Sequence, residues 1–359
     1  MKTWKWYWVL GLFAALSGCQ RSVTKMIQLD PGQPGVKAQM NEMIPMRDGV
    51  KLAVDIYRPK SAAGKLPAVL TILPYGTDAR MIKEVGRLFA RHGYIFLAED
   101  CRGIENSEGK FFPLVYDYYD AHDTLAWVAR QDWFDGNLGM WGGSYFGYTQ
   151  WEAAPDSPVL KAMVPLFTSP NMHQMVINGG ALEFIMVEGW LTGMEAQIKK
   201  EKLQPEFNTG FYNQPLRNAQ PLDLGMLQTR PELLDQDPMI LLNHPGDSEF
   251  ALPTNYSGEY AKVSAPGLLV GGWFDQFLQP QLDDFVKIRA EGRGEAKKSR
   301  LIVGPWTHGV PSSRFEEGKL AGVRFYAKET FAWYEHWLKG VPNGIENEAP
   351  VKIFIMGEN

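Results

Sequence analysis

The fold is constrained most by a series of short apolar runs separated by stretches of helical periodicity. The runs do not alternate cleanly between apolar and polar residues, which is typical of parallel strands buried on both faces. Ala121, Leu125 and Val128 form a helical stripe before one of them. The strand–helix–strand order predicts an α/β fold with a doubly wound, mostly parallel sheet. The runs are residues 68–73, 94–98, 138–141, 160–164, 268–270 and 301–303.

A different pattern precedes these runs. The turn dipeptide Asp48-Gly49 is followed by residues 50–57, in which apolar residues alternate with mostly polar ones. A period of two after such a turn predicts an antiparallel hairpin with one face buried.

The strand–helix alternation breaks between about residues 168 and 262. Residues 182–194 carry apolar side chains at helical spacing, which we interpret as packing in preference to a binding site, although one segment can serve both purposes. We therefore expect one α/β domain formed by residues 37–167 and 263–349, with residues 168–262 inserted between its two parts as a helical cap.

Composition excludes several classes of protein. The chain has 359 residues, 45% of them hydrophobic, which excludes a disordered chain. The net charge of −5, without a long basic run, argues against nucleic acid as a partner. Cys19 and Cys101 are the two cysteines, too few and too far apart for a zinc ribbon or a disulfide scaffold. No metal or organic cofactor is expected.

The first 19 residues have the features of an export signal. A short basic segment precedes an apolar run at residues 6–16, which is too short to span a bilayer. Residues 16–19 then resemble a bacterial lipoprotein signal that ends at a lipidated Cys19. Gln20 follows it, and by the same resemblance favours the outer membrane. We expect a lipid-anchored envelope protein on the periplasmic side of the outer membrane, with residues 20–36 as a tether.

Residues 142–147, Gly-Gly-Ser-Tyr-Phe-Gly, lie between an expected strand and an expected helix that opens around Tyr148. A nucleophile elbow needs small residues at such a turn, and it would place the Ser144 hydroxyl above the sheet. The backbone N–H of Tyr145 could then stabilise an oxyanion. Because Phe146 occupies the second position after the serine, the motif alone also fits a glycine-rich turn with a capping serine.

A serine nucleophile needs a base, and the base needs an acid that orients it. His308 follows the run at 301–303, at the strand end where α/β folds hold their sites. Asp275 follows the run at 268–270 in the same way. The chain order Ser144, Asp275, His308 is that of α/β-hydrolases. The poorer candidates are His92, His122, His173, His244 and His336, and Asp100, Asp283 and Asp284.

Six short motifs together resemble one family, the cocaine-esterase-like and X-prolyl-dipeptidyl-peptidase-like serine hydrolases, which include α-amino acid ester hydrolases and some cephalosporin acylases. The family's nucleophile motif has its glycine at the position of Gly147. The motifs are residues 45–50 with 55–59, 74–75, 100–103 with 107–109, 135–139 with 142–147, 271–275, and 304–308.

The resemblance adds three expectations. Tyr75 is expected to donate its phenolic O–H to the oxyanion hole. Residues 350–359 look like the start of the family's C-terminal jelly-roll-like β domain, most of which is missing here. Asp100 and Arg102 are expected to form a buried structural pair.

We therefore expect a serine hydrolase that cleaves ester or amide bonds through an acyl-enzyme, most simply a carboxylesterase or acylase. X-Pro dipeptidyl-peptidase and α-amino acid ester hydrolase activities are alternatives, as is a non-catalytic, anchored binding protein. The substrate would be a small ester, amide or short peptide. Release of a dipeptide needs a carboxylate that pairs with the substrate amine. Four residues in or near the cap could supply it, although we interpret them as solvated cap surface: Glu183, Glu188, Asp247 and Glu249.

Overall fold

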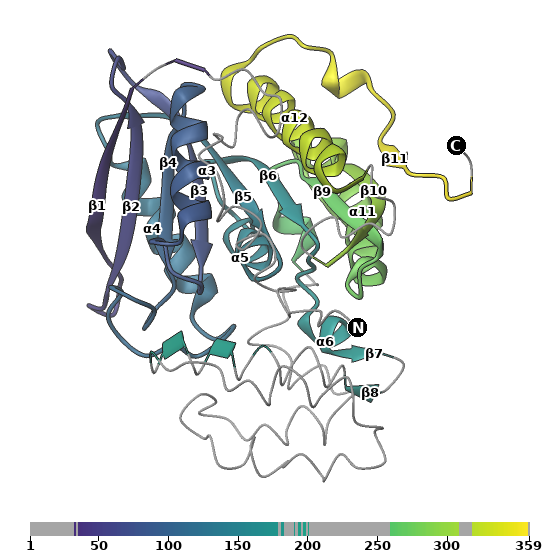
Figure 1. Cartoon of the computed structure of the whole chain (residues 1–359), viewed down its shortest axis with the longest axis horizontal. Helices are drawn as coiled ribbons and strands as arrows, with labels where there is room; N and C mark the ends of the chain where they lie inside the picture. The colour runs from purple at the N-terminus through teal and green to yellow at the C-terminus, as the bar shows by residue number, and fades with distance from the viewer. Residues whose placement is uncertain are drawn as a thin grey trace, which may run out of the picture.

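The computed structural model describes residues 32–33, 35–178, 181–182, 259–308 and 318–357, with residues 190, 193–194, 197–198 and 200 between them. Its centre is a nine-stranded sheet with the order β1-β2-β4-β3-β5-β6-β9-β10-β11 (Figure 1). β1 and β2, and β2 and β4, pair antiparallel, and every later neighbour pairs parallel. The strands are β1 Val36–Pro45, β2 Lys51–Pro59, β3 Leu66–Leu73, β4 Ile95–Asp100, β5 Phe134–Gly143, β6 Leu160–Leu166, β9 Leu268–Phe274, β10 Arg300–Thr307 and β11 Val351–Ile353.

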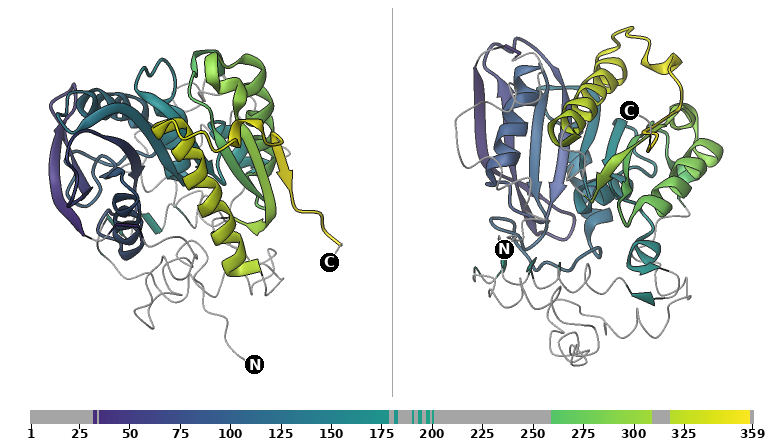
Figure 2. Two further views of the ribbon diagram at one scale, coloured as in Figure 1. Left: turned by 90° about the horizontal axis from the view of Figure 1, so that it is seen from above. Right: turned by 45° about the vertical axis from the view of Figure 1, so that its right-hand side comes forward.

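Helices cover both faces of this sheet (Figures 1 and 2). One apolar layer joins the sheet to α3 (Arg80–Arg91) and α12 (Gly318–Lys339). The other joins it to α4 (Asp117–Ala129), α5 (Tyr145–Ala153) and α11 (Leu278–Glu291). The predicted doubly wound α/β fold is therefore confirmed, and the six apolar runs lie in β3, β4, β5, β6, β9 and β10.

The predicted hairpin is also confirmed, but the prediction that only one of its faces is buried is wrong. Residues 52–57 of β2 are all buried, because β2 lies between β1 and β4 and carries α3 on one face. A Cβ atom on Gly86 of α3 would lie 2.6 Å from the ring of Tyr57 in β2. The close approach of helix and strand therefore depends on this glycine.

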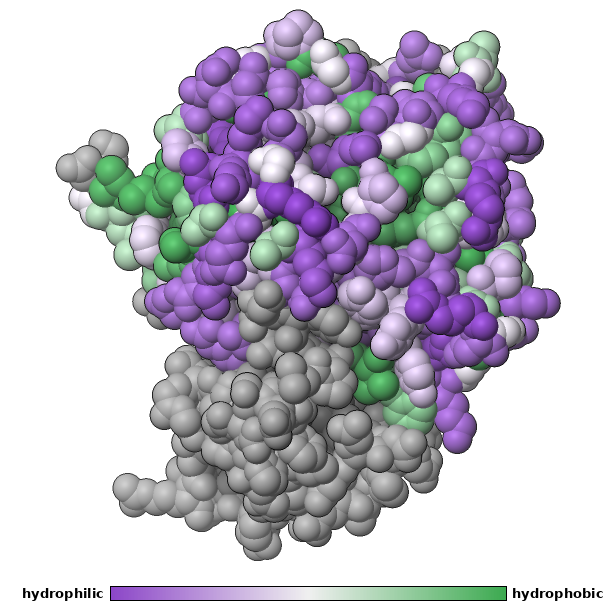
Figure 3. Space-filling model, turned by 180° about the vertical axis from the view of Figure 1, so that it is seen from behind, coloured by the Kyte–Doolittle hydropathy of each residue, from purple (hydrophilic) through white to green (hydrophobic). Residues whose placement is uncertain are grey.

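The end of the chain joins the same sheet. β11 pairs parallel with β10, and the apolar residues Ile353, Phe354, Ile355 and Met356 at and after β11 are exposed. They belong to the hydrophobic projection visible at one edge of the molecule in Figure 3. The expectation that residues 350–359 open a separate β domain stays a prediction.

Only parts of the inserted segment are described. They are α6 (Met172–Val176), a two-stranded hairpin of β7 (Ile177–Asn178) and β8 (Ala181–Leu182), and helical positions at 190, 193–194 and 197–198. The expected signal peptide with Cys19, tether residues 20–31 and 34, and residues 201–258 lie outside the described part. Among the helices that are described, none is both long enough and apolar enough to cross a membrane.

Candidate active site

Ser144 occupies a sharp turn between β5 and α5. Its backbone has φ 55° and ψ −124°, a conformation that non-glycine residues rarely adopt and that is typical of a strained functional turn. The Ser144 N–H donates to the Leu166 carbonyl at 2.9 Å, and its carbonyl accepts from the Gly147 and Tyr148 N–H groups. α5 begins at Tyr145, three residues earlier than the sequence predicted, so the serine stands directly at the helix N-terminus.

Two glycines make this turn possible. Gly142 has φ +151°, and a Cβ atom there would lie 2.7 Å from the Phe146 carbonyl oxygen. A Cβ atom on Gly147 would lie 2.5 Å from Thr168. The small residues of the motif are therefore required by the close packing of β5, α5 and the segment after β6.

His308 joins Ser144 to Asp275. His308 Nε2 lies 2.9 Å from Ser144 Oγ, and His308 Nδ1 lies 2.9 Å from Asp275 Oδ1. Because an ionised carboxylate only accepts, the Nδ1 atom carries the proton and Nε2 presents its lone pair to the serine hydroxyl. The three residues come from the carboxyl ends of β5, β9 and β10, as the sequence predicted.

The carboxylate and the imidazole are held firmly. The Asp275 side chain is fully buried, whereas that of His308 is 21% exposed and so open to a substrate. Asp275 Oδ1 also accepts the Phe277 N–H at 3.2 Å. The Phe277 ring lies edge-on to the His308 ring at 4.7 Å, and Phe167 flanks it at 6.4 Å. The sequence reasoning missed Phe277, although its position two residues after Asp275 is a usable signal.

Tyr75 lies just after β3, and its ring meets Phe146 edge-on at 6.1 Å. Its hydroxyl oxygen accepts the Trp190 Nε1–H at 3.1 Å. Burial raises the pKa of Tyr75 to about 12, against the opposing effects of its hydrogen bonds to Trp190 and to the Ser144 side chain. Tyr75 therefore keeps its proton at neutral pH, and its hydroxyl lies beside the Ser144 side chain.

Tyr145 is anchored through its side chain. Its hydroxyl donates to Asp117 Oδ2 at 2.6 Å and accepts the Leu114 N–H at 2.9 Å. Its ring stacks on Trp190 at 5.7 Å with an interplanar angle of 17°. Asp117 was not identified from the sequence, and Trp190 was recognised only as part of the apolar stripe at residues 182–194. Both act through tertiary contacts that no local motif marks.

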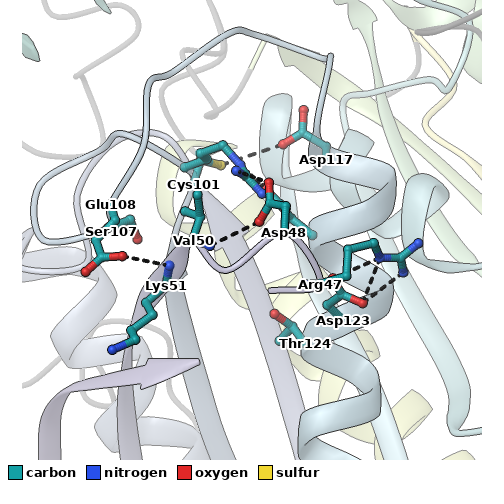
Figure 4. A network of polar contacts seen from close by, with 12 residues as sticks. Arg47, Asp48, Val50, Lys51, Cys101, Ser107, Glu108, Asp117, Asp123 and Thr124 are labelled. Carbon is teal, nitrogen blue, oxygen red and sulfur yellow. Dashed lines mark hydrogen bonds and ion pairs between the residues drawn. The ribbon is translucent and has the colours of Figure 1, made fainter. Parts of the chain in front are cut away.

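Asp117 is the first residue of α4 and is buried. Burial raises its pKa to about 7, more than its hydrogen bond from Tyr145 lowers it. The Cys101 thiol lies 3.9 Å from Asp117 Oδ1, the contact drawn in Figure 4. A carboxyl group that titrates near neutrality therefore lies directly behind Tyr145.

The expected pairing of Asp100 with Arg102 is wrong. Arg102 pairs with Asp120 at 2.6 Å and with Asp48 at 2.7 Å. Asp100 instead accepts the Thr77 N–H at 2.7 Å and its hydroxyl at 3.1 Å. Because Asp100 ends β4 and Arg102 begins the next turn, their side chains point to different neighbours. Their buried, structural character was predicted correctly.

The remaining candidates lie away from Ser144. His92 follows α3, and His122 and His336 lie within α4 and α12. Asp283 and Asp284 lie on α11, where Asp284 accepts the Tyr260 hydroxyl at 2.6 Å and Asp283 accepts the Gln174 amide at 3.2 Å. His244 and the carboxylates of residues 183, 188, 247 and 249 lie outside the described part, as does the side chain of His173.

The sheet order, the strained serine turn and the Ser–His–Asp hydrogen bonds together define the α/β-hydrolase class of serine hydrolases. Residues 48–310 match the family model described as X-Pro dipeptidyl-peptidase (S15 family). The chain belongs to that family.

The relatives of the chain include esterases. It is 33% identical over 345 residues to the cocaine esterase of Rhodococcus sp. (strain MB1 Bresler), covering 88% of this chain and 58% of the relative. It is 24% identical to a putative serine esterase of Mycobacterium bovis, covering 88% of this chain and 59% of that protein. The chain thus spans less than two thirds of the length of these relatives.

Solved structures show the same fold. An aminopeptidase from a marine sediment archaeon, Thaumarchaeota archaeon, is similar with a TM-score of 0.69 and 25% identity, covering 90% of this chain and 57% of that one. An α-amino acid ester hydrolase is similar with a TM-score of 0.65 and 22% identity, and the match covers 94% of this chain and 60% of that one. At that identity the second likeness concerns the fold alone.

Proposed function

We propose that this chain is the catalytic part of a serine hydrolase that cleaves carboxylic esters or amides through an acyl-enzyme. The observation that carries the proposal is the pair of 2.9 Å hydrogen bonds that joins Ser144 to His308 and His308 to Asp275. A nucleophile, a base in the correct tautomer and a buried orienting carboxylate are what acyl transfer needs.

The proposed reaction has two halves. His308 Nε2 takes the Ser144 proton while Oγ attacks the substrate carbonyl carbon. The Tyr75 O–H and the Tyr145 N–H donate to the oxyanion, and Asp275 stabilises the imidazolium. His308 then gives the proton to the leaving alcohol or amine as its bond to the carbonyl carbon breaks. In the second half a water molecule loses its proton to His308, attacks the acyl carbon and releases the acid and Ser144.

A carboxylesterase or acylase is the first candidate because the described surroundings of the triad are aromatic. Phe167 and Phe277 flank His308, and Phe146 and Trp190 contact Tyr75. These rings suit an uncharged acyl group. Removal of an N-terminal X-Pro dipeptide is the second candidate, favoured by the family model, and hydrolysis of α-amino acid esters is the third.

The proposal is tested with a fluorophosphonate probe and a panel of chromogenic substrates. The wild-type chain should be labelled and should hydrolyse nitrophenyl butyrate, and Ser144→Ala should abolish both. Labelling that persists in Ser144→Ala would exclude Ser144 as the nucleophile. Comparison of nitrophenyl butyrate with an X-Pro-nitroanilide and an α-amino acid nitrophenyl ester separates the three candidates.

A binding protein built on a hydrolase fold is the alternative from another class. This alternative predicts, in the same experiment, a wild-type chain that is folded but neither reacts with the probe nor hydrolyses any of the substrates.

We also propose that Cys19 is lipidated and anchors the protein to the outer membrane. The support is the motif at residues 16–19, with Gln20 after it. In a bacterial host the chain should incorporate radiolabelled palmitate and fractionate with outer membranes. Cys19→Ala should lose the label; a label that remains on that variant would contradict the assignment.

A further inference from the structure

Trp190 contacts the side chains of both residues that are expected to supply oxyanion donors. Its indole Nε1 lies 3.1 Å from the Tyr75 hydroxyl oxygen, and its ring stacks on the Tyr145 ring at 5.7 Å. The Phe111 ring also contacts the indole edge-on, at 6.4 Å. Trp190 comes from the segment inserted after β6, whereas Tyr75 follows β3 and Tyr145 opens α5.

The chemistry of the indole fixes the direction of its hydrogen bond to Tyr75. An indole N–H can only donate, so the Tyr75 oxygen must accept. One lone pair of that oxygen is then occupied, and the hydroxyl proton must point to another neighbour. The Ser144 side chain lies next to the Tyr75 hydroxyl, on the side where a bound carbonyl group would be attacked. With the indole N–H bound to the oxygen, the Tyr75 proton stays available for an acceptor beside the nucleophile.

The indole is itself held in place. Tyr145 is fixed at its hydroxyl by Asp117 at 2.6 Å and by the Leu114 N–H at 2.9 Å, so the ring on which Trp190 stacks cannot rotate freely. Stacking with a tilt of only 17° and the edge contact to Phe111 restrict the orientation of the indole ring. A donor held this way loses little conformational entropy when it orients a hydroxyl group.

We propose that Trp190 is a positioning residue for catalysis: its indole N–H orients the Tyr75 hydroxyl so that the Tyr75 proton is directed at the oxyanion. The proposal rests on the proposed serine hydrolase function. It is distinct from a role of Trp190 in contacting substrate, because it acts entirely through Tyr75.

The test is a double-mutant cycle on nitrophenyl butyrate with Trp190→Phe, Tyr75→Phe and the double variant. Trp190→Phe keeps an aromatic ring for Tyr145 to stack on but removes the N–H donor together with the second ring of the indole, a loss of size that the Trp337→Phe control shares. We expect it to lower kcat by about five- to tenfold, the effect of one lost hydrogen bond, with KM nearly unchanged. In the Tyr75→Phe background the same change should have almost no further effect, because there is no hydroxyl left to orient.

Trp337→Phe is the matched control. Trp337 lies on α12, and its buried indole nitrogen has no hydrogen-bond partner among the described residues. The Trp337→Phe variant carries the same chemical change away from the nucleophile and should have the kcat of the wild-type chain. A second readout is the affinity for phenylboronic acid, whose serine adduct places a charged oxygen in the oxyanion hole. Trp190→Phe should weaken the binding of phenylboronic acid by about the same factor by which it lowers kcat.

The outcomes separate the two proposals. A wild-type chain without turnover or labelling would sink the proposed function and this inference with it. An active wild type with an equally active Trp190→Phe would overturn the positioning role alone. So would a loss of the same size in the Tyr75→Phe background, since that would show a direct effect on substrate or on packing. Circular dichroism of each variant verifies that it is folded.

Discussion

His308 Nε2 lies 2.9 Å from Ser144 Oγ although 164 residues separate them in the chain. The sheet accounts for this approach. β5, which ends at Gly143, is separated from β9 by β6 alone, and β9 is followed at once by β10. Because these strands are parallel, the residues that follow their carboxyl ends meet at one edge of the sheet.

Asp275→Asn should keep the fold and lower kcat by about 10⁴-fold. An asparagine side chain can donate to Nδ1 and so favours the tautomer that carries the proton on Nε2, where the serine needs a base. The measurement is kcat on nitrophenyl butyrate. Asp283→Asn on α11 is the control and should retain activity; equal losses in the two variants would argue against the assigned acid.

Tyr75→Phe should lower kcat by about 100-fold, the effect of one oxyanion donor, with little change in KM. Tyr57→Phe is a matched control. The Tyr57 hydroxyl is buried and has no hydrogen-bond partner among the described residues, so its loss should not affect turnover. A Tyr75→Phe variant with wild-type kcat would leave the Tyr145 N–H without its expected companion.

Gly142→Ala should destabilise the chain by about 2 kcal/mol more than Gly136→Ala, because only the first forces a close contact with Phe146. Both glycines have positive φ, at +151° and +99°, and a Cβ atom on Gly136 would meet no atom within 4 Å. The pair therefore separates a steric clash from backbone strain. Urea unfolding measures the difference, and similar midpoints would mean that the elbow tolerates a methyl group.

Asp117→Asn should stabilise the chain relative to wild type at pH 8 more than at pH 5. Burial raises the pKa of Asp117 from 3.8 to about 7, so between those values the folded chain holds a proton that the unfolded chain has lost. The contribution of Asp117 to the free energy of unfolding is therefore fully present below pH 4 and is lost as the pH rises through 7. Asparagine does not titrate, so the variant lacks this pH dependence. The full loss that it avoids is up to about 4 kcal/mol, because each unit of pKa difference corresponds to about 1.4 kcal/mol.

Asp48→Asn should change the pH dependence of the free energy of unfolding in the opposite direction. The hydrogen bond from Arg102 lowers the pKa of Asp48, so its contribution is present above pH 4 and is lost as pH falls. Unfolding free energies at pH 3, 5 and 8 should therefore diverge in opposite directions for the two variants. Parallel profiles would exclude Asp117 as a source of the pH dependence.

Much of the fold and of the serine–histidine–aspartate arrangement could be predicted because each part has a local signal. The apolar runs mark the strands, and Ser144, Asp275 and His308 each follow one directly. Tyr75 carried no such signal in itself, since an aromatic residue after a strand is usually packing, and only the family resemblance identified it.

The errors and omissions concern contacts between segments. Arg102 was expected beside Asp100, yet its partners come from α4 and from the turn before β2. Both faces of β2 are buried because of where β2 lies in the sheet, which its own alternation does not reveal. Trp190 and Asp117 are positioned by three-dimensional packing alone, so spacing along the chain does not indicate them.

The insertion after β6 has a consequence for enzyme engineering. Ser144, Asp275 and His308 are held by β5, β9 and β10, so their hydrogen bonds do not pass through the inserted segment. A segment from another protein could therefore be grafted between β6 and β9 to change substrate scope without rebuilding the triad. Such a chimera would have to return an indole donor to the Tyr75 hydroxyl, one of the contacts through which the inserted segment is coupled to the scaffold.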